Sequence, residues 1–234
     1  MLPWTKVAEA RAPGGARWEL ARRADEWVVR AAGRVLMSSR THGSEEALAR
    51  AALARAARPR AVLVGGLGMG YTLRAALDAL PAEARVVVAE LVPELVAWNR
   101  GPLGAAAGHP LADARVEVVE RDVLSVAAGR PGRFDAVLLD VDNGPASRSA
   151  AVGRPENAAL YGVAGAATCA AALRPGGVLA VWSAGPAPEY LKTLGRVGLA
   201  ASAEVVPARE GGGARHVLLL GVRPGPGDRP RRAG

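Results

Sequence analysis

The apolar positions of this chain follow a regular pattern between residues 61 and 183. Short runs in which nearly every residue is apolar are typical of strands buried on both faces, and segments with helical spacing separate them. The predicted strands are 61–66 (AVLVGG), 85–90 (RVVVAE), 115–120 (RVEVVE), 135–141 (DAVLLDV) and 177–183 (GVLAVWS). The predicted helices are 71–80, 93–99, 122–128 and 158–173. Strands that alternate with helices in this way indicate a parallel sheet covered by helices on both faces.

The two flanks of this region have a different pattern. The β-prone runs EWVVR and RVLMSS surround the tripeptide AAG and predict a hairpin, which a weakly patterned lead-in over 1–14 precedes. A helix is predicted in GSEEALARAALARAA, with Ser44 as its N-cap. Near the end of the chain, SAEVVPAR and ARHVLLLGV predict a closing antiparallel hairpin. We therefore expect a lead-in and hairpin over 1–43, an α/β domain over 44–224 and a disordered basic tail over 225–234.

The composition narrows the function classes. The chain has 234 residues, of which 50% are hydrophobic and 4% aromatic, so we expect one sizeable core built on Ala, Val and Leu. Its formal charge of +8 comes from scattered arginines and the tail rather than from a basic stripe, so we do not expect nucleic-acid binding. The single cysteine, Cys169, and the three isolated histidines have no metal-ligand spacing. No signal-like segment or membrane-spanning apolar run is present, which predicts a cytoplasmic protein without membrane contact.

The strand over 61–66 ends in a run of glycines that a helix follows. Glycines let the backbone approach a ligand, and the N-terminus of the next helix offers free N–H groups. A P-loop would need Gly-Lys-Ser/Thr where this chain has GYT, and the dinucleotide pattern G-x-G-x-x-G would need a glycine at position 71. The remaining class is an adenosyl nucleoside held by G-x-G-x-G, which Gly66, Gly68 and Gly70 supply next to Gly65.

Acidic residues follow the next three strands. Glu90, about 20 residues after the glycines, is placed to bind both ribose hydroxyls. Asp122, followed by Val123, is placed to accept a hydrogen bond from an adenine amino group, although the N-cap of the next helix explains it equally well. Asp140 and Asp142 lie at the end of the predicted strand over 135–141. We expect them at the mouth of the nucleoside site, over the reacting sulfonium group of the ligand. Because two close carboxylates repel each other, we expect one of them to have a raised pKa and to act as a base near neutral pH.

These segments together resemble the class I S-adenosylmethionine-dependent methyltransferase fold and, more narrowly, the spermidine synthases (polyamine aminopropyltransferases). The resemblance covers roughly residues 16–195, in DEWVVRAAGRVLMSSRTHGSEEALA, GGLGMG, LADARVEVVERDV, FDAVLLDVDNGPA and ENAALYGVAGAATCAAALRPGGVLAV. It implies a Rossmann-like α/β fold with a seven-stranded, mostly parallel sheet, a closing antiparallel hairpin and a small N-terminal β-hairpin. The family hairpin often supports dimers, so the resemblance is compatible with a homodimer.

The resemblance also implies roles for individual residues. Asp140 matches the acid that orients and helps to deprotonate the attacking amine, and Asp142 would position the same nucleophile. Glu46, Asn143 and Tyr161 would contact the acceptor. The glycines, Val123 and the acids after the other strands would hold the nucleoside.

The chain departs from the family pattern at positions that hold cations. The family's acid in the glycine turn, which holds the amine of the aminopropyl chain, is Gly68 here. The family's Tyr-His-Glu reads Ser44-Glu45-Glu46, and its Asp-x-x-Asp-Pro loop is shortened. The family's glutamate after the fifth strand is missing, because that segment offers only Ser183.

We therefore expect a spermidine-synthase-like enzyme that moves an alkyl group from a sulfonium donor to the amine of a small molecule or peptide. The donor is S-adenosylmethionine or its decarboxylated form, and the missing acids slightly favour methyl transfer over aminopropyl transfer. Three alternatives stay open: a true spermidine synthase, a nucleoside-binding partner subunit without catalysis, and a nucleic-acid methyltransferase.

Overall fold

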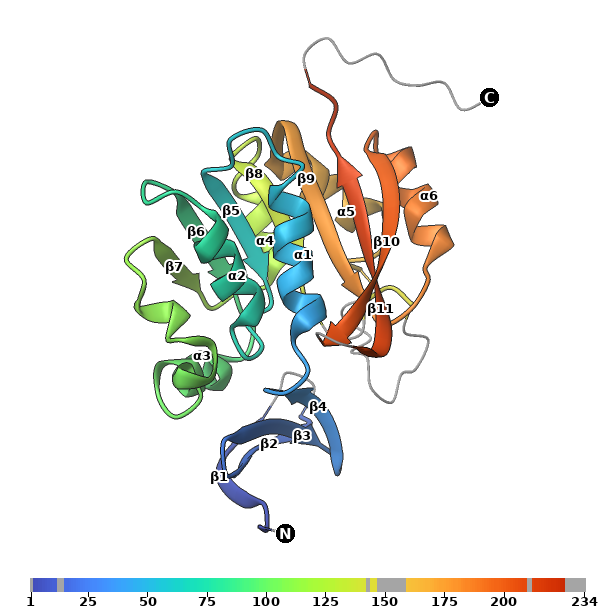
Figure 1. Cartoon of the computed structure of the whole chain (residues 1–234). Coiled ribbons are helices and arrows are strands. Elements are labelled where there is room, and N and C mark those ends of the chain that lie inside the picture. The colour runs from blue at the N-terminus through green and yellow to red at the C-terminus, as the bar shows by residue number, and fades with distance from the viewer. Residues whose placement is uncertain (1, 12–14, 142–143, 147–158, 210–211, 226–234) are drawn as a thin grey trace.

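The computed structural model describes residues 2–11, 15–141, 144–146, 159–209 and 212–225 (Figure 1). The strands are β1 (Thr5–Arg11), β2 (Arg17–Arg23), β3 (Glu26–Ala31), β4 (Arg34–Ser38), β5 (Ala61–Gly65), β6 (Arg85–Ala89), β7 (Val116–Val119), β8 (Phe134–Leu139), β9 (Leu173–Ser183), β10 (Ala200–Arg209) and β11 (Gly212–Val222). The helices are α1 (Gly43–Leu53), α2 (Tyr71–Ala79), α3 (Pro93–Arg100), α4 (Val123–Ala128), α5 (Val163–Ala172) and α6 (Pro188–Arg196), with short 3₁₀ helices η1 (Gly104–Ala107) and η2 (Pro110–Ala112).

The central sheet has seven strands in the order β10-β11-β9-β8-β5-β6-β7. Strands β5 to β9 pair in parallel, while β11 is antiparallel to β9 and β10 is antiparallel to β11. The chain first builds outward from β5 to β6 and β7, then returns to place β8 on the other side of β5. The carboxyl ends of β5 and β8 therefore meet at the switch point, where open α/β sheets bind their ligands. The predicted sheet and its closing hairpin are confirmed.

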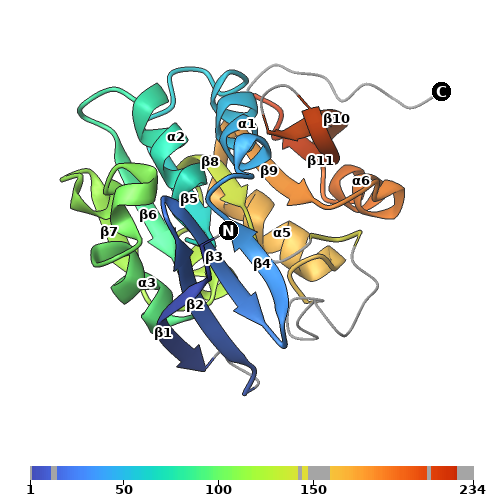
Figure 2. The same ribbon diagram turned by 60° about the horizontal axis from the view of Figure 1, so that its bottom comes forward.

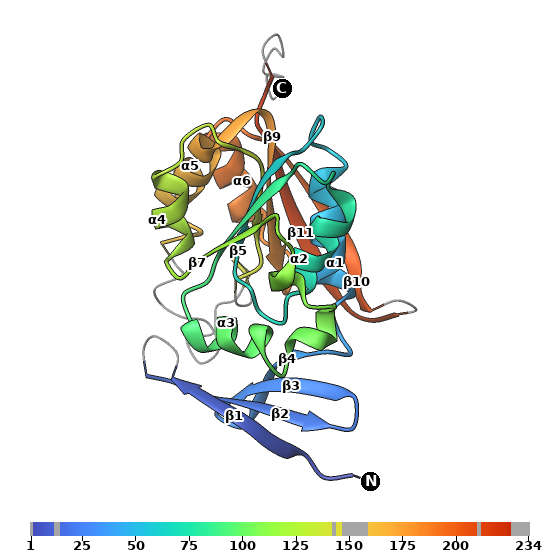
Figure 3. The same ribbon diagram turned by 90° about the vertical axis from the view of Figure 1, so that its left-hand side faces the viewer.

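Successive side chains of each strand point to opposite faces of the sheet and pack into two separate hydrophobic cores. On β5, Val62 and Val64 pack with α1 and α2, whereas Leu63 packs with α4, α5 and α6 on the opposite face. Figure 3 shows the two helical layers on either side of the sheet. Because both faces are covered, these strands carry apolar residues at nearly every position.

The N-terminal segment forms a separate four-stranded antiparallel sheet in the order β1-β2-β3-β4. The predicted hairpin is its β3–β4 pair, joined through Ala32 and Gly33, which both have positive φ (49° and 73°) as a two-residue type I′ turn requires. The weakly patterned lead-in contains a strand that the sequence analysis did not predict, since Thr5–Arg11 forms β1. β1 is an edge strand with mostly exposed side chains, so it has no hydrophobic alternation to reveal it in the sequence.

This sheet packs against the carboxyl edge of the central sheet, over α3 and the start of α2 (Figure 2). Trp18, Leu20 and Trp27 share one apolar cluster with Leu95 and Trp98 of α3. The N-terminal sheet therefore covers the edge at which the predicted site residues lie.

Two predicted boundaries differ from the structure. The helix expected over 158–173 is α5, and it begins only at Val163. β9 begins at Leu173 rather than at residue 177, because the backbone of Gly176 and Gly177 hydrogen-bonds to Arg223 after β11. The predicted basic tail lies outside the described residues, apart from Gly225.

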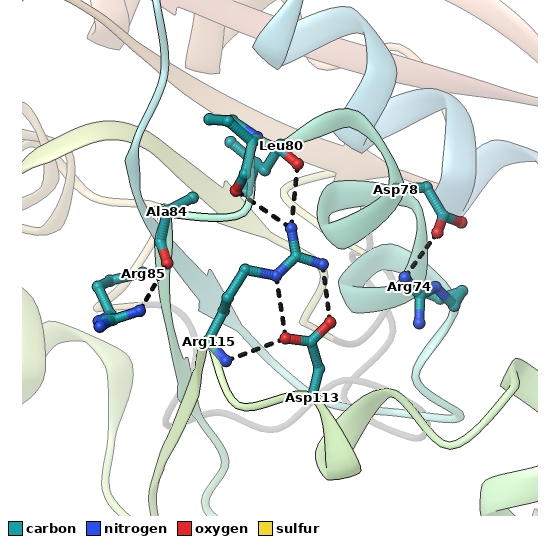
Figure 4. A network of polar contacts seen from close by, with 8 residues as sticks. Arg74, Asp78, Leu80, Ala84, Arg85, Asp113 and Arg115 are labelled. Atoms are coloured by element: carbon teal, nitrogen blue, oxygen red, sulfur yellow. Dashed lines mark hydrogen bonds and ion pairs between the residues drawn. The ribbon is translucent and has the colours of Figure 1, made fainter.

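At the amino edge of the sheet, Arg115 joins β7 to the end of α2 (Figure 4). Its guanidinium donates to both carboxylate oxygens of Asp113, from Nε at 2.9 Å and from Nη2 at 2.7 Å. It also donates to the carbonyl oxygens of Leu80 at 3.0 Å and Pro81 at 3.3 Å. This network fixes the amino edge, on the side of the sheet away from the glycine turn.

Within the described ranges, no helix has both the length and the apolar character needed to cross a membrane.

Candidate functional site

The glycine turn runs from the end of β5 to α2 and lies against the end of β8. Gly66 has a φ of +86°, and a Cβ there would lie 2.3 Å from the carbonyl oxygen of Asp140. Gly70 has a φ of +88°, and a Cβ there would lie 2.9 Å from Pro110. Both the left-handed backbone and the close approach exclude a side chain at these two positions.

Glu90, just after β6, is buried and holds the glycine turn in place. One carboxylate oxygen accepts a hydrogen bond from the backbone N–H of Leu67 at 2.8 Å, and the other accepts one from the N–H of Val92 at 2.8 Å. The residue predicted to bind ribose therefore also organises the loop on which a nucleoside would rest.

Asn99 of α3 supports the same turn, and the sequence analysis missed it. Its Nδ2 donates to the carbonyl oxygens of Gly68 and Leu95, each at 2.9 Å. Its Oδ1 is buried and has no hydrogen-bond partner in the described residues, and it lies 3.1 Å from where a Cβ of Gly70 would be. A polar residue one position after the buried Trp98 was the available signal.

A pocket opens where these elements meet, at the switch point between β5 and β8. Its open space, solvent at the mouth included, is about 580 Å³. Six of the predicted nucleoside-site and catalytic residues line it: Gly66, Gly68, Glu90, Asp122, Val123 and Asp140. The N-terminal sheet adds Trp18 and Met37, which the sequence analysis did not assign to the site. The other lining residues are Ala89, Leu91, Leu95, Arg121, Val141 and Leu160.

Two of the predicted glycines do not line the pocket. Gly65 packs under it, where a Cβ would lie 2.7 Å from Val123. Gly70 faces Pro110 and Asn99. These two glycines shape the turn from behind.

Asp122 caps α4, since its Oδ1 accepts from the backbone N–H of Ser125 at 3.1 Å. The cap and the pocket position are compatible, because one carboxylate accepts several hydrogen bonds. Its predicted contact with adenine stays a prediction.

Asp140 follows β8 directly and lines the pocket beside the glycine turn. Its backbone N–H donates to the carbonyl oxygen of Gly65 at 2.9 Å, and its Oδ2 accepts from the Thr72 hydroxyl at 2.6 Å. Desolvation raises the pKa of Asp140 to about 6, although the Thr72 hydrogen bond favours the ionised form. A carboxylate with this pKa can take up a proton close to neutral pH.

Glu45, in the first turn of α1, is the second acid at this place. Burial raises its pKa to about 7, and the nearby charge of Asp140 adds to the shift. Glu46, which the resemblance assigned to the acceptor, does not line the pocket and binds His42 Nδ1 at 2.7 Å and Arg50 at 3.1 Å. Its acceptor role stays a prediction.

The helical pattern of α1 could have shown that Glu45 is partly buried. Its buried positions are 44, 48, 49, 52 and 53, so position 45 lies on the buried face, one turn before Ala49. The expectation that Ser44 caps this helix is wrong. α1 begins at Gly43, and the Ser44 hydroxyl instead accepts a hydrogen bond from Trp182 Nε1 at 3.0 Å.

The remaining predicted residues follow β8 along the chain. The Tyr161 hydroxyl donates to the carbonyl oxygen of Val141 at 2.8 Å, so it holds the backbone just after Asp140, while its neighbour Leu160 lines the pocket. Asp142 and Asn143 lie outside the described residues. The described residues contain no group of three or more His, Cys, Asp or Glu side chains with metal-binding geometry.

Comparisons with known proteins give a structural likeness. No protein-family model matches the chain. No curated protein matches it either. Among solved structures, a spermidine synthase in complex with the transition-state analogue AdoDATO and the spermidine synthase from Thermotoga maritima each match with a TM-score of 0.72 and 16% identity, over 93% of this chain and 72% of theirs. A probable spermidine synthase from Corynebacterium glutamicum matches with a TM-score of 0.62 and 20% identity, over 93% of this chain and 79% of its own.

The chain has the fold of the spermidine synthases. The predicted Rossmann-like fold with a seven-stranded sheet is confirmed, and the predicted small N-terminal β-hairpin is part of a larger, four-stranded sheet. At this level of identity the likeness establishes the fold, and the activity is argued from the site below.

Proposed function

We propose that this protein is an aminopropyltransferase that moves the aminopropyl group of decarboxylated S-adenosylmethionine to an amine acceptor. The observation that carries the proposal is Asp140, a desolvated carboxylate at the end of β8 that lines the pocket at the switch point together with the glycine turn. The solved proteins with this fold support the proposal, since two are spermidine synthases, one of them bound to a transition-state analogue, and a third is a probable one.

The pocket offers separate surfaces to the parts of such a donor. The adenine ring would lie near Asp122, between apolar side chains such as Leu91, Val123 and Leu160. The ribose would lie near Glu90, and the sulfonium would lie between the glycine turn and Asp140. Trp18 and Met37 would cover the donor from the N-terminal sheet.

Asp140 would act on the amine that attacks the donor. Its carboxylate takes a proton from the acceptor ammonium, which frees the nitrogen lone pair. The nitrogen then bonds to the carbon next to sulfur, the carbon–sulfur bond breaks, and its electron pair stays on sulfur. Methylthioadenosine and a secondary ammonium result. The site accelerates this displacement by aligning nitrogen, carbon and sulfur.

Methyl transfer from S-adenosylmethionine is the second candidate, and one observation favours it. Gly68 lines the pocket at the position of the family's acid for the aminopropyl amine. The nearest atom to a Cβ at Gly68 would be Met37 Sδ at 3.7 Å, so there is room for a side chain but no acid. The methyl preference drawn from the sequence rests on this and the other missing acids, while the solved neighbours support aminopropyl transfer.

A calorimetric titration with each donor, followed by mass spectrometry of the products, separates the candidates. Aminopropyl transfer to a diamine such as putrescine releases methylthioadenosine, whereas methyl transfer releases S-adenosylhomocysteine. Binding of a donor without any product would indicate a partner subunit without catalysis. If neither donor binds, the proposed function is wrong.

A variant at Gly68 sharpens this test. Gly68→Asp would place a carboxylate in the pocket, and its φ of +52° is one that aspartate tolerates. We expect the variant to bind the decarboxylated donor about 5–50-fold more tightly, as a charge-assisted hydrogen bond would provide. Gly68→Asn, which has the same shape without the charge, is the control and should leave the donor preference unchanged.

A further inference from the structure

The hydroxyl of Ser44 lies at the centre of a buried polar cluster behind Asp140. Trp182 Nε1 donates to Ser44 Oγ at 3.0 Å. Glu45 Oε2 is 2.6 Å from the same oxygen, and His216 Nδ1 is 2.9 Å from it. Ser44 is fully buried, so the three partners come from α1, β9 and β11 rather than from solvent.

The capacity of one hydroxyl restricts how these bonds are arranged. A serine hydroxyl donates once and accepts twice, and the indole N–H of Trp182 is only a donor. One of the two remaining partners must therefore accept the Ser44 proton while the other donates to Ser44 Oγ. If Glu45 is ionised it accepts, and His216 must carry its proton on Nδ1. If Glu45 is protonated it donates, and His216 Nδ1 must be bare.

We propose that Ser44 couples the protonation of Glu45 to the tautomer of His216, and that this chain carries a proton away from the acid pair Glu45 and Asp140. The coupling is a property of the free protein, while its use during transfer rests on the proposed function.

The proton movement balances without any other reactant. The Glu45 O–H bond breaks and its proton goes to Ser44 Oγ, while the Ser44 proton goes to His216 Nδ1. His216 then releases its Nε2 proton, and it retains some exposed surface through which this proton can leave. Glu45 ends as a carboxylate and His216 as the other neutral tautomer, so one proton has left the site.

The surroundings of Glu45 favour such an exchange near neutral pH. The titratable groups that face it are Asp140 from β8, Tyr71 from α2, Glu46 from its own helix and His216 through Ser44. Burial and the Asp140 charge bring the pKa of Glu45 to about 7. Burial lowers the pKa of His216, so its ring is neutral where Glu45 titrates.

Thr72 places Asp140 and Glu45 next to each other. Its hydroxyl donates to Asp140 Oδ2 at 2.6 Å and lies 3.3 Å from the backbone carbonyl oxygen of Glu45. A cationic amine that loses its proton to Asp140 leaves that carboxylate neutral. Ionisation of Glu45 through the relay then restores one negative charge to the pair. Transfer of the Asp140 proton to the Glu45 carboxylate makes Asp140 a base again for the next acceptor, with Glu45 protonated as at the start. Glu45 is thus a positioning residue that acts through Asp140 by setting the charge of the pair, and Asp140 is the group that touches the amine.

The test is nitrogen NMR of the full-length protein with ¹⁵N-labelled histidine, recorded without nucleoside between about pH 6.5 and pH 9. The chain has only three histidines, and His216→Gln identifies the signal by its loss. We expect His216 to change from the Nε2–H tautomer to the Nδ1–H tautomer as pH rises, with a midpoint near the pKa of Glu45, about 7. Ser44→Ala should abolish the change, and Glu45→Gln should remove its pH dependence.

The control is His109→Gln, since His109 lies in the segment between η1 and η2, away from the relay, and should leave the His216 transition unchanged. A single His216 tautomer over the whole range, or the same transition in Ser44→Ala, would overturn the coupling. A protein that shows the transition but binds neither sulfonium donor would keep the coupling and overturn the proposed function. If transfer occurs, Ser44→Ala should change its pH profile more than its donor affinity. An unchanged profile would overturn the role of the relay in transfer.

Discussion

Carboxylates at the two edges of the central sheet differ in their hydrogen-bond partners and in the direction of their pKa shifts. At the amino edge, Asp113 is held by the fork of Arg115, and Asp135 is held by Arg174 at 2.9 Å and 3.1 Å. The Arg115 hydrogen bonds lower the pKa of Asp113 to about 2. The carboxylate of Asp113 is therefore held in its charged form.

At the carboxyl edge, the acids accept from uncharged donors. Glu90 and Asp122 accept from backbone N–H groups, and Asp140 accepts from the Thr72 hydroxyl. Desolvation without a guanidinium partner raises the pKa of Asp140 to about 6 and that of Glu45 to about 7. Asp113 is thus held ionised by arginine, while Asp140 and Glu45 keep a proton affinity suited to chemistry near neutral pH.

An Asp→Asn substitution at each edge should give the largest difference, measured as the transfer rate. Asp140→Asn removes the proton acceptor, so we expect the transfer rate to fall about 10²–10⁴-fold while donor binding changes little. Steady-state kinetics and calorimetry measure the two effects. Asp113→Asn is the matched control and should leave the rate unchanged. Equal losses in both variants would show that Asp140 acts only through stability.

Two glycines with positive φ provide the next comparison. Gly66→Ala brings a Cβ to 2.3 Å from the Asp140 carbonyl, so we expect donor binding to weaken at least about tenfold as the turn shifts. At the amino edge, Gly132 has a φ of +61° and no atom within 4 Å of its Cβ position. Gly132→Ala should therefore cost only backbone strain, about 1 kcal/mol, with donor affinity unchanged. Calorimetry and urea unfolding distinguish the two outcomes, and weakened binding in Gly132→Ala would contradict this explanation.

The buried charge of Glu45 should make stability depend on pH. Its folded pKa of about 7 is above the unfolded value of 4.5, so the folded state binds more protons between these limits and loses stability as pH rises through them. Glu45→Gln lacks this pH-dependent contribution to stability. We expect its free energy of unfolding relative to wild type to rise by about 2 kcal/mol between about pH 5 and pH 8. Urea unfolding at several pH values measures this difference, and parallel curves for wild type and Glu45→Gln would refute the raised pKa.

The smallest effect should come from the amino edge. Arg115→Met removes the fork on Asp113 and the contacts with Leu80 and Pro81, so we expect a loss of about 1 kcal/mol at neutral pH. Because the folded pKa of Asp113 is below its unfolded value of 3.8, the ion-pair part of this loss should disappear as pH falls from about 4 towards 2. Arg85→Met, which loses a single 3.3 Å contact to the Ala84 carbonyl, is the control. Thermal and urea unfolding measure both, and a similar loss in the two variants would contradict the role of the fork.

Much of the carboxyl edge was predictable from the sequence. Strand ends are marked by the change from apolar to polar residues, and parallel strands place all their carboxyl ends at one edge. For this reason the sequence pattern alone is enough to place Gly66, Glu90, Asp122 and Asp140 together. It is not enough to find the residues that support them. Asn99 and Thr72 act on the site from helices, and their contacts depend on how each helix is rotated against the sheet.

The sequence by itself determined the order of elements, the parallel sheet and the position of the glycine turn, because these follow from local periodicity and glycine content. Only the tertiary structure decided that residues 5–11 form a strand, since an edge strand needs a partner and carries no hydrophobic signal of its own. Only the tertiary structure brought Ser44 within reach of His216, which is 172 positions away along the chain. It also selected Glu45 over Glu46 as the neighbour of Asp140, because the environment of a carboxylate is set by packing from several elements at once.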